Sequence, residues 1–254
     1  MRSPIRTAFY RSFAAVVLLT GLLSSIALPR PQGQTEKIQQ SMKGAVLKGK
    51  APVSKEVLKV NLPKPEETTL KNGLRVVLLE RHKVPTFAME MVVLSGGLSD
   101  PKDLRGVASY TASLLREGTK TKNSKQIAEA VDSVGATLNA NSSLASTIST
   151  VSASGLTDNF DQVLSLFSDV ILNPAFPKDE VEKYKARQLS QLQFIKSLPQ
   201  FLSISTFRRA IYGDHPAGEL FPPKEAIEKI TPETLESFHS TYYRPNNAIL
   251  AVVG

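Results

Sequence analysis

The 254-residue sequence contains no cysteine and only three histidines. Without thiols, the chain cannot form disulfides, thiolate metal sites or cysteine nucleophiles. The histidines are His82, His215 and His239, which stand far apart on an expected loop, turn and helix and lack the spacing of metal ligands. Thiol chemistry is therefore excluded, and the histidine spacing predicts no metal site.

Motifs of several other function classes are also absent. The sequence has no Gly-x-Ser-x-Gly nucleophile elbow, no phosphate-binding glycine loop and no internal repeat. Its 31 lysines and arginines exceed its 23 aspartates and glutamates, which gives a formal net charge of +8. These basic residues are scattered and form no basic helix with interleaved aromatic residues. We therefore predict no nucleic-acid binding.

The first 27 residues have the features of a secretory signal peptide. Arg2, Arg6 and Arg11 precede an apolar run over residues 13–28, in which Ser25-Ile26-Ala27 offers small residues for cleavage. The run is shorter than the roughly 18–20 residues that cross a bilayer, so we expect cleavage rather than the alternative, a permanent anchor. Cleavage would reduce the net charge from +8 to +5. We predict an exported protein, periplasmic if its source is bacterial.

Residues 28–67 differ from the rest of the chain in composition. This segment holds five prolines, repeated Gln and Lys, and little periodicity. We expect a Pro/Lys-rich linker, although an apolar cluster at residues 57–62 leaves open an arm that orders on a partner. Residues 68–254 would then form the folded domain, and the 41% hydrophobic content is sufficient for a substantial core.

Alternating apolar residues predict several strands in this domain. Asn72-Gly73 is a typical hairpin turn between a strand near Thr69 and a second strand over residues 74–80. A third strand is expected over residues 87–94, inside the sheet. One of its faces should be covered and the other largely covered, because only Glu90 is charged. Three further strands are expected at residues 136–141, 147–153 and 248–253.

Helical spacing of apolar residues predicts helices between these strands. The expected helices are one from Leu104 to Leu115, one starting at the N-cap Ser124, one capped by Thr157 and stopped at Asn173-Pro174, one over residues 177–196, and one opening at Thr231-Pro232. Because long helical runs interrupt the strand pairs, we predict an α+β fold: a largely antiparallel sheet with helices packed chiefly on one face.

The stretch from Gly106 to Thr119 has the most specific pattern in the sequence. It follows the frame Gly-x-Ala, six further residues, and Leu-x-x-Gly-Thr. On a helix, Ser109, Ala112 and Ser113 stand at i, i+3 and i+4 and therefore share one face. This frame resembles the active-site helix of the insulinase, pitrilysin and mitochondrial processing peptidase family.

Three further segments are similar to the same family. Gly96 and Asp100 match a turn before that helix, Tyr212-Gly213-Asp214-His215-Pro216 matches a Tyr-Gly-x-His-Pro turn, and the run from Tyr242 to Asn247 matches the end of the family domain. The resemblance covers about residues 68–254. Since family members usually contain a second homologous domain, we expect that its counterpart is missing from this sequence.

The resemblance implies a zinc site whose ligands have been replaced here. In the family, the helix carries an inverted H-x-x-E-H motif, and a later helix supplies a third ligand, a Glu. Ser109 and Ser113 fall at the histidine positions, Ala112 at the catalytic Glu, and Gln191 at the distal Glu. A serine hydroxyl is a poor zinc ligand, and an alanine methyl cannot accept a proton. Although the family uses zinc, we predict no catalytic residue, no metal and no cofactor for this chain. The simpler interpretation of the four replaced positions is that their side chains line an empty pocket or allow close packing.

The resemblance also implies a surface for an extended peptide. In the family, the strand expected here at residues 136–141 is a sheet edge that pairs with substrate, so Asn139, Ala140 and Asn141 are candidate binding residues. Backbone hydrogen bonds at such an edge require no particular side chain. The alternative is a strand that is simply paired within its own sheet.

Three functions remain open from the sequence. The first is a non-catalytic, exported subunit that assembles with a zinc-bearing paralogue and helps to bind extended peptides, because several family members work as such pairs. The second is an active zinc endopeptidase with a misaligned metal site. The third is a stand-alone peptide-binding scaffold. Zinc content after purification alone, and co-purification with a zinc-bearing partner, distinguish the three.

Overall fold

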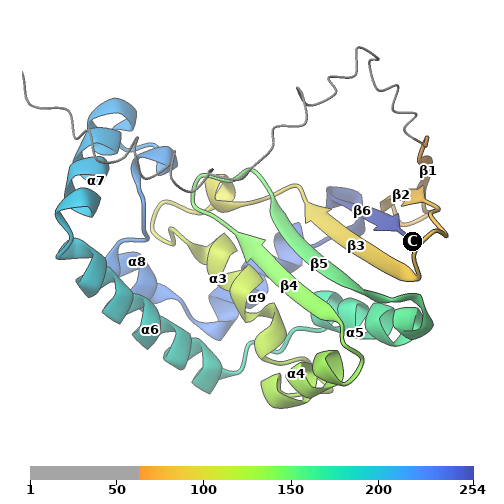
Figure 1. Ribbon diagram of the computed structural model, residues 1–254. Coiled ribbons are helices and arrows are strands. Elements are labelled where there is room, and N and C mark those ends of the chain that lie inside the picture. The colour runs from red at the N-terminus through yellow and green to blue at the C-terminus, as the bar shows by residue number, and fades with distance from the viewer. Residues whose placement is uncertain (1–62) are drawn as a thin grey trace, which may run out of the picture. The chain divides into compact units, whose positions relative to one another are not determined.

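Six strands form a single sheet in the order β1-β2-β6-β3-β5-β4 (Figure 1). The computed structural model describes residues 63–254, so the predicted signal peptide (residues 1–27) and the predicted linker up to residue 62 lie outside the described residues. The strands are β1 (Glu66–Thr69), β2 (Arg75–Leu79), β3 (Thr86–Val93), β4 (Thr137–Ser142), β5 (Ser149–Leu156) and β6 (Ala248–Val253). All neighbouring pairs are antiparallel except β2 and β6, which run parallel. The predicted, largely antiparallel sheet is confirmed.

The first two strands form the hairpin expected at Asn72-Gly73. Gly73 has a φ of +88°, a left-handed value that favours glycine, and the Asn72 side chain accepts a backbone hydrogen bond of 3.1 Å within the turn. β1 begins at Glu66, two residues before residue 68, from which we expected the folded domain to extend. The reason is that Glu66 and Glu67 already pair with β2.

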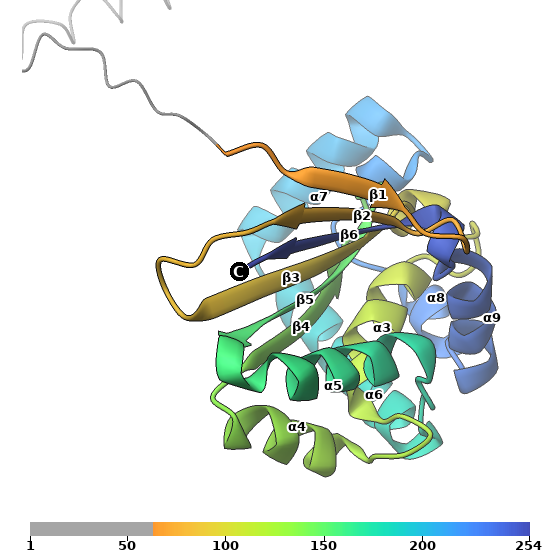
Figure 2. The ribbon, with the colours of Figure 1, turned by 90° about the vertical axis from the view of Figure 1, so that its right-hand side faces the viewer.

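The helices of the described residues pack chiefly on one face of this sheet, as predicted. They are α3 (Val107–Leu114), α4 (Ser124–Ser133), α5 (Phe160–Leu172), α6 (Lys178–Lys196), α7 (Pro199–Tyr212), α8 (Lys224–Lys229) and α9 (Pro232–Tyr242). Figure 2 shows α3, α5 and α9 on the same side of the strands. The exception is α7, which has no buried residue. The sequence patterns did not predict α7 and α8. Within residues 63–254, no helix is both long and apolar enough to span a membrane.

Two helix starts differ from the prediction. The N-cap of α4 is Asn123 rather than Ser124, because Asn123 and Gln126 form a reciprocal capping box with hydrogen bonds of 2.9 and 3.0 Å. Thr157 opens a short 3-10 turn, and α5 begins after it, at Phe160, without a side-chain cap. The expected start of α9 at Thr231 is confirmed, with Thr231 as its cap.

Strand β3 lies inside the sheet, between β6 and β5, as predicted. Its residues Phe87, Met89, Met91 and Val93 are buried and face the helices. On its opposite face, Ala88 and Glu90 are exposed. The expectation that this second face would also be largely covered is therefore wrong, because in residues 63–254 the helices pack on one face of the sheet (Figure 2).

Helix α3 is held at its amino end by a buried carboxylate. Asp100 accepts hydrogen bonds from the backbone N–H groups of Gly106, at 2.6 Å, and Ala108, at 3.0 Å. Burial raises the pKa of the Asp100 carboxyl to about 6, against the lowering effect of these two bonds and of the Arg105 guanidinium. Gly106 has a φ of +95°, and a Cβ there would lie 2.7 Å from Pro222. Aspartate and glycine together fix where α3 begins.

Replacing Asp100 by Ala should therefore destabilise the fold. The substitution leaves two buried N–H groups without an acceptor, so we expect the free energy of unfolding to fall by about 1–3 kcal/mol. Urea denaturation followed by circular dichroism at pH 7.5 measures this change. Asp103→Ala is the matched control, because Asp103 is exposed and its carboxylate lies 3.7 Å from the Lys229 ammonium, at the long end for an ion pair. Equal stability of the two variants would contradict the capping role.

Helices α9 and α5 are joined by a partly buried histidine, His239. The Nε2 atom of His239 lies 2.8 Å from the carbonyl oxygen of Ile171, so the Nε2–H donates to it. The ring stacks on Tyr243 with a centroid distance of 4.8 Å and meets Phe176 edge-on at 6.1 Å. Burial lowers the pKa of His239 below its ordinary value of 6.5. Folding therefore favours the neutral ring.

His239 should contribute stability that is lost in mild acid. The folded pKa lies below the unfolded value, so this contribution is complete above pH 6.5 and is lost as the pH falls below it. The raised pKa of Asp100, about 6, acts in the opposite direction over the same range and is common to both proteins compared here. We therefore expect the urea midpoint of His239→Phe, which keeps the aromatic contacts but cannot titrate, to rise relative to that of the wild type between pH 7.5 and 5.5. His82→Gln, at an exposed loop position, should keep the wild-type dependence. A wild-type dependence in His239→Phe would exclude this contribution of His239.

Candidate functional site

The structure brings Ser109, Ala112 and Ser113 together on one turn of α3, as expected from their spacing. Ala112 is fully buried, and the two serines are half-buried. Like the rest of α3, this turn is anchored through the Asp100 cap and lies on the helix side of the sheet. The three side chains therefore occupy a fixed position beneath the sheet.

A tyrosine from α6 fills the space beside Ser113. The Tyr184 hydroxyl donates a hydrogen bond of 3.0 Å to the Ser113 Oγ. Its ring meets Tyr110 edge-on at a centroid distance of 5.0 Å, and the Arg187 guanidinium lies 5.4 Å from the Tyr184 centroid. Burial raises the pKa of the Tyr110 hydroxyl, so this group stays neutral. A packed aromatic pair, without a buried charge, connects α3 to α6 here.

Next to this pair is a hollow of about 280 Å³. Polar groups from four elements or their connections line it: Ser109 of α3, Ser142 and Ser143 at the end of β4, Gln188 of α6, Arg208 of α7 and Glu219. Leu144, Leu220, Phe221 and Pro222 add apolar walls. One carboxylate oxygen of Glu219 is buried without a hydrogen-bond partner. The hollow can therefore accept a small polar group next to apolar surface.

The residue that α6 brings to Ser109 is Gln188 rather than Gln191. Gln191 is exposed and does not line the hollow. The distal position stays a prediction at Gln191, and Gln188, three residues earlier, is the glutamine of α6 that lines the hollow. The periodicity of α6 could have found it, because the inward-facing Val181 and Tyr184 are followed by position 188 at helical spacing.

These side chains do not fit a zinc ion. Zinc sites in proteins use thiolates, imidazoles and carboxylates, whereas Ser109, Ser113 and Gln188 offer only neutral oxygen or amide groups. The Tyr184 ring also occupies space at Ser113, where the resemblance implies the second histidine. Within residues 63–254, no three His, Asp or Glu side chains are grouped so that they could hold a metal ion.

Among residues 63–254, strand β4 is the last strand of the sheet and pairs only with β5. The Arg116 guanidinium donates to the carbonyl of Leu138, so that carbonyl faces away from β5. Because backbone groups alternate sides along a strand, Ala140 also turns its N–H and C=O to the free edge, whereas Asn139 and Asn141 face β5. Of the three predicted binding residues, only Ala140 thus offers backbone groups to a peptide.

The chain is similar to known peptidases over most of the described residues. Residues 75–220 match the family described as Insulinase (Peptidase family M16). An uncharacterized zinc protease of Rickettsia felis is 28% identical over 186 residues, which is 73% of this chain and 45% of that protein. A probable mitochondrial-processing peptidase subunit beta of Schizosaccharomyces pombe is 26% identical over 194 residues, 76% of this chain and 42% of that protein.

Solved structures give the same result for the fold. The inactive domain of a peptidase M16 from Pseudomonas fluorescens superimposes with a TM-score of 0.71 and 26% identity, over 76% of this chain and 47% of that one. A Helicobacter pylori protease gives a TM-score of 0.68 with the same identity and coverage. The chain thus spans less than half the length of these relatives. Since the family match covers more than half of the sequence and the fold agrees, the chain belongs to the insulinase family, peptidase family M16.

Proposed function

We propose that this protein is a non-catalytic member of the insulinase family that assembles with a zinc-bearing paralogue and contributes to the binding of extended peptides. We include in the proposal that it is exported, to the periplasm in a bacterium. The hydrogen bond from Tyr184 to Ser113 is the observation that carries the proposal. It joins two neutral side chains where a peptidase of this family would need metal ligands.

The loss of chemistry at the site is consistent across two helices. On α3, serines and an alanine replace the groups that would bind zinc and accept a proton, and on α6 the facing residue is the neutral Gln188. Tyr184 and Tyr110 pack into the same region. Replacement of ligands on both helices supports the loss of the metal site rather than its relocation to neighbouring residues. A similar solved structure is itself described as an inactive domain of an M16 peptidase.

Peptide binding is supported by the free edge of β4 and the hollow beside it. An extended peptide can add to an exposed sheet edge through backbone hydrogen bonds, and Ala140 presents its N–H and C=O there. Ser142 and Ser143, at the end of the same strand, line the hollow, so a peptide along β4 would pass its opening. Neither feature requires a metal.

Zinc content tests the proposal against an active enzyme. We expect the full chain, purified alone without chelator and dialysed against zinc, to hold well below one zinc per chain by elemental analysis, because its site offers neutral groups. We also expect it to co-purify with a homologue from the same genome that keeps an intact H-x-x-E-H motif. Stoichiometric zinc, or cleavage of a peptide by the chain alone that a chelator abolishes, would instead indicate an active peptidase. A chain that binds a peptide but no such homologue would be a stand-alone scaffold.

Restoring the ligands should reveal the role of Tyr184. A fourfold variant introduces the family's zinc-binding groups: Ser109→His, Ala112→Glu, Ser113→His and Gln188→Glu. We expect this variant to bind zinc weakly. Adding Tyr184→Ala should tighten zinc binding about tenfold or more, because it removes the side chain next to residue 113. Isothermal titration with zinc measures both affinities, and circular dichroism checks the fold. The matched control carries Gln191→Glu in place of Gln188→Glu and should bind more weakly. Equal affinity with and without Tyr184 would show that the ring does not obstruct the metal position.

A further inference from the structure

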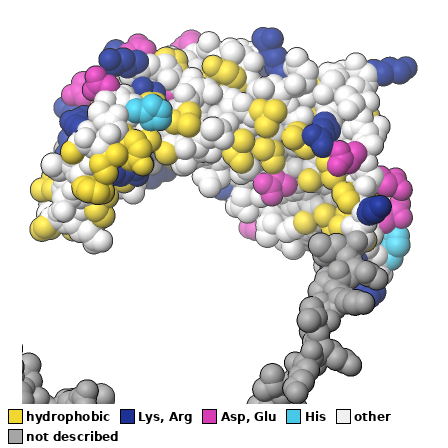
Figure 3. Space-filling view, turned by 90° about the horizontal axis from the view of Figure 1, so that it is seen from above, with side chains coloured by type: hydrophobic (Ala, Val, Ile, Leu, Met, Phe, Trp, Pro, Cys, Tyr) yellow, Lys and Arg dark blue, Asp and Glu magenta, His cyan; other side chains and the backbone are white. Residues whose placement is uncertain are grey.

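Helix α7 is attached to the domain mainly at its two ends. None of its fourteen residues is buried. Only Ser197 and Leu198 separate it from α6, and near its other end the Arg208 Nε donates to the Ala217 carbonyl at 2.8 Å. Figure 3 shows hydrophobic side chains at the surface of the arm on the left of the view, where Figure 1 places α7. Because packing supplies most of the stability of a helix in a protein, α7 is held weakly along its length.

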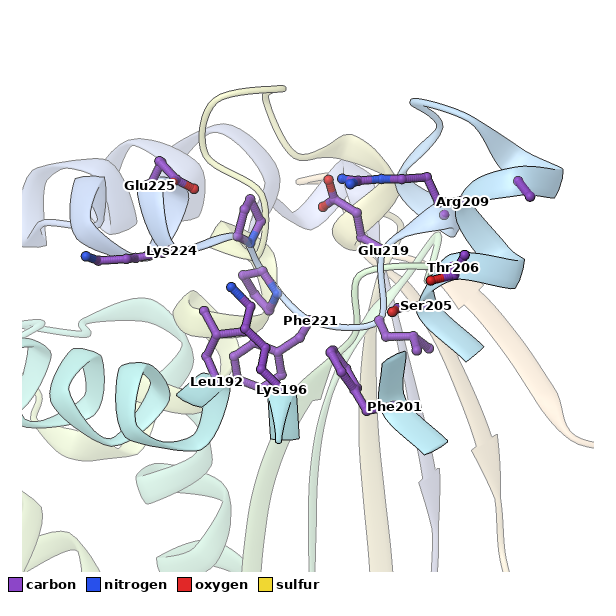
Figure 4. Close-up of a pocket in the computed structure, with 15 residues that line it drawn as sticks. Leu192, Lys196, Phe201, Ser205, Thr206, Arg209, Glu219, Phe221, Lys224 and Glu225 are labelled. Atoms are coloured by element: carbon purple, nitrogen blue, oxygen red, sulfur yellow. The ribbon is translucent and has the colours of Figure 1, made fainter. Parts of the chain in front are cut away.

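A hollow of about 460 Å³ lies between the inner side of α7, helix α6 and the chain that follows α7. Phe201, Ser205 and Arg209 of α7 stand at i, i+4 and i+8 and line this hollow from one side. Leu192 of α6 and Phe221 line it from the other side (Figure 4). The inner side of α7 therefore faces the rest of the domain across a space that the side chains of the described residues leave open.

The two walls of this hollow are chemically complementary. At one end, the Phe201 ring lies across from the apolar side chains of Leu192 and Phe221 (Figure 4). At the other end, the Arg209 guanidinium and the Glu219 carboxylate point to the same part of the hollow (Figure 4). In the described part of the chain, the Glu219 Oε2 atom is buried and accepts no hydrogen bond. Since a buried carboxylate oxygen without a donor is unfavourable, an approach of Arg209 to this oxygen stabilises the domain.

Both connections of α7 can absorb a movement of the helix. Gly213 follows α7 directly and has a φ of +56°, a left-handed value that favours glycine. A Cβ at this position would meet no atom within 4 Å, so the chain has free space around it. At the other end, the connection to α6 consists of two residues outside both helices. A few such residues at the ends of an element are sufficient for a hinge, so α7 can shift inward as a rigid helix.

We propose that α7 is a lid that closes on this hollow, with an ion pair between Arg209 and Glu219 holding it shut. Closure brings Phe201 against Phe221 and gives the buried carboxylate oxygen its missing donor. Glu219 also lines the smaller hollow beside Ser109, and so does Arg208 of α7. Closure therefore changes the wall of that smaller hollow. The lid itself does not depend on the proposed function, whereas its effect on a bound peptide rests on that function.

Thiol accessibility tests the lid, because the chain contains no cysteine. In the full chain, Ser205→Cys places the only thiol inside the hollow, and Ser203→Cys places it at an exposed position of α7 that does not line the hollow. We expect Glu219→Gln, which cannot form the ion pair, to speed maleimide labelling of residue 205 about tenfold or more, because labelling requires the open state. Labelling of residue 203 should change less than about twofold. Mass spectrometry measures both rates.

The matched control for this substitution is Glu225→Gln. Glu225 also lines the hollow, but it belongs to α8 and lies at the end away from Arg209 (Figure 4). This variant should leave the labelling of residue 205 unchanged. Arg209→Gln should act as Glu219→Gln does, and the two together should add nothing further, since they break one interaction. Exchange of the two charges, Arg209→Glu with Glu219→Arg, should restore slow labelling.

Two results would overturn the lid. The first is a labelling rate at residue 205 that neither Glu219→Gln nor Arg209→Gln alters. The second is an equal acceleration at residues 203 and 205, because α7 would then unfold rather than open; circular dichroism detects the accompanying loss of helix. Neither readout involves zinc, a peptide or a second chain. Failure of the lid therefore leaves the proposed function to its own tests, and failure of the proposed function leaves the lid in place.

Discussion

The contact between α3 and α6 determines the character of this site, and it is made of neutral groups. A metal ion at this contact would require imidazole and carboxylate ligands, whose buried charge only the ion compensates. With the neutral Ser113 and Gln188 at this contact instead, an empty space between the helices would cost packing contacts. Tyr184 restores them, with a ring against Tyr110 and a hydroxyl on Ser113. The two helices thus stay together without a cation.

The edge of β4 does not depend on this contact. It depends on the register with β5 and on Arg116, neither of which touches Ser113 or Gln188. A backbone-binding edge and a metal site are therefore physically separable in this fold, because one uses main-chain groups and the other uses side chains. Under the proposed function, the chain would lack the means to cleave a peptide but keep the means to hold one.

The sequence predicted most of the secondary structure because local signals determine it. Strand β6 was predicted with its observed bounds, and Thr231 was identified as the cap of α9, since alternation and capping are visible in a short window. Predictions that needed the third dimension failed. Apolar alternation in β3 could not show that its second face has no helix over it, and α7 was missed because its apolar residues serve no internal core. The exposure of Gln191 was not predicted, because distances between motifs do not fix which face of α6 turns inward.

Helices α6 and α7 together form one wall of the hollow. Only Ser197 and Leu198 separate the two helices, so α6 carries Tyr184 and Gln188 at the site and leads directly into α7. On α7, Arg208 lines the hollow, while Phe207, its neighbour in sequence, is 65% exposed. Because no residue of α7 is buried, this wall is held less firmly than the wall formed by α3, whose residues belong to the core. Under the proposed function, a peptide along β4 would therefore meet one firmly packed wall and one weakly packed wall.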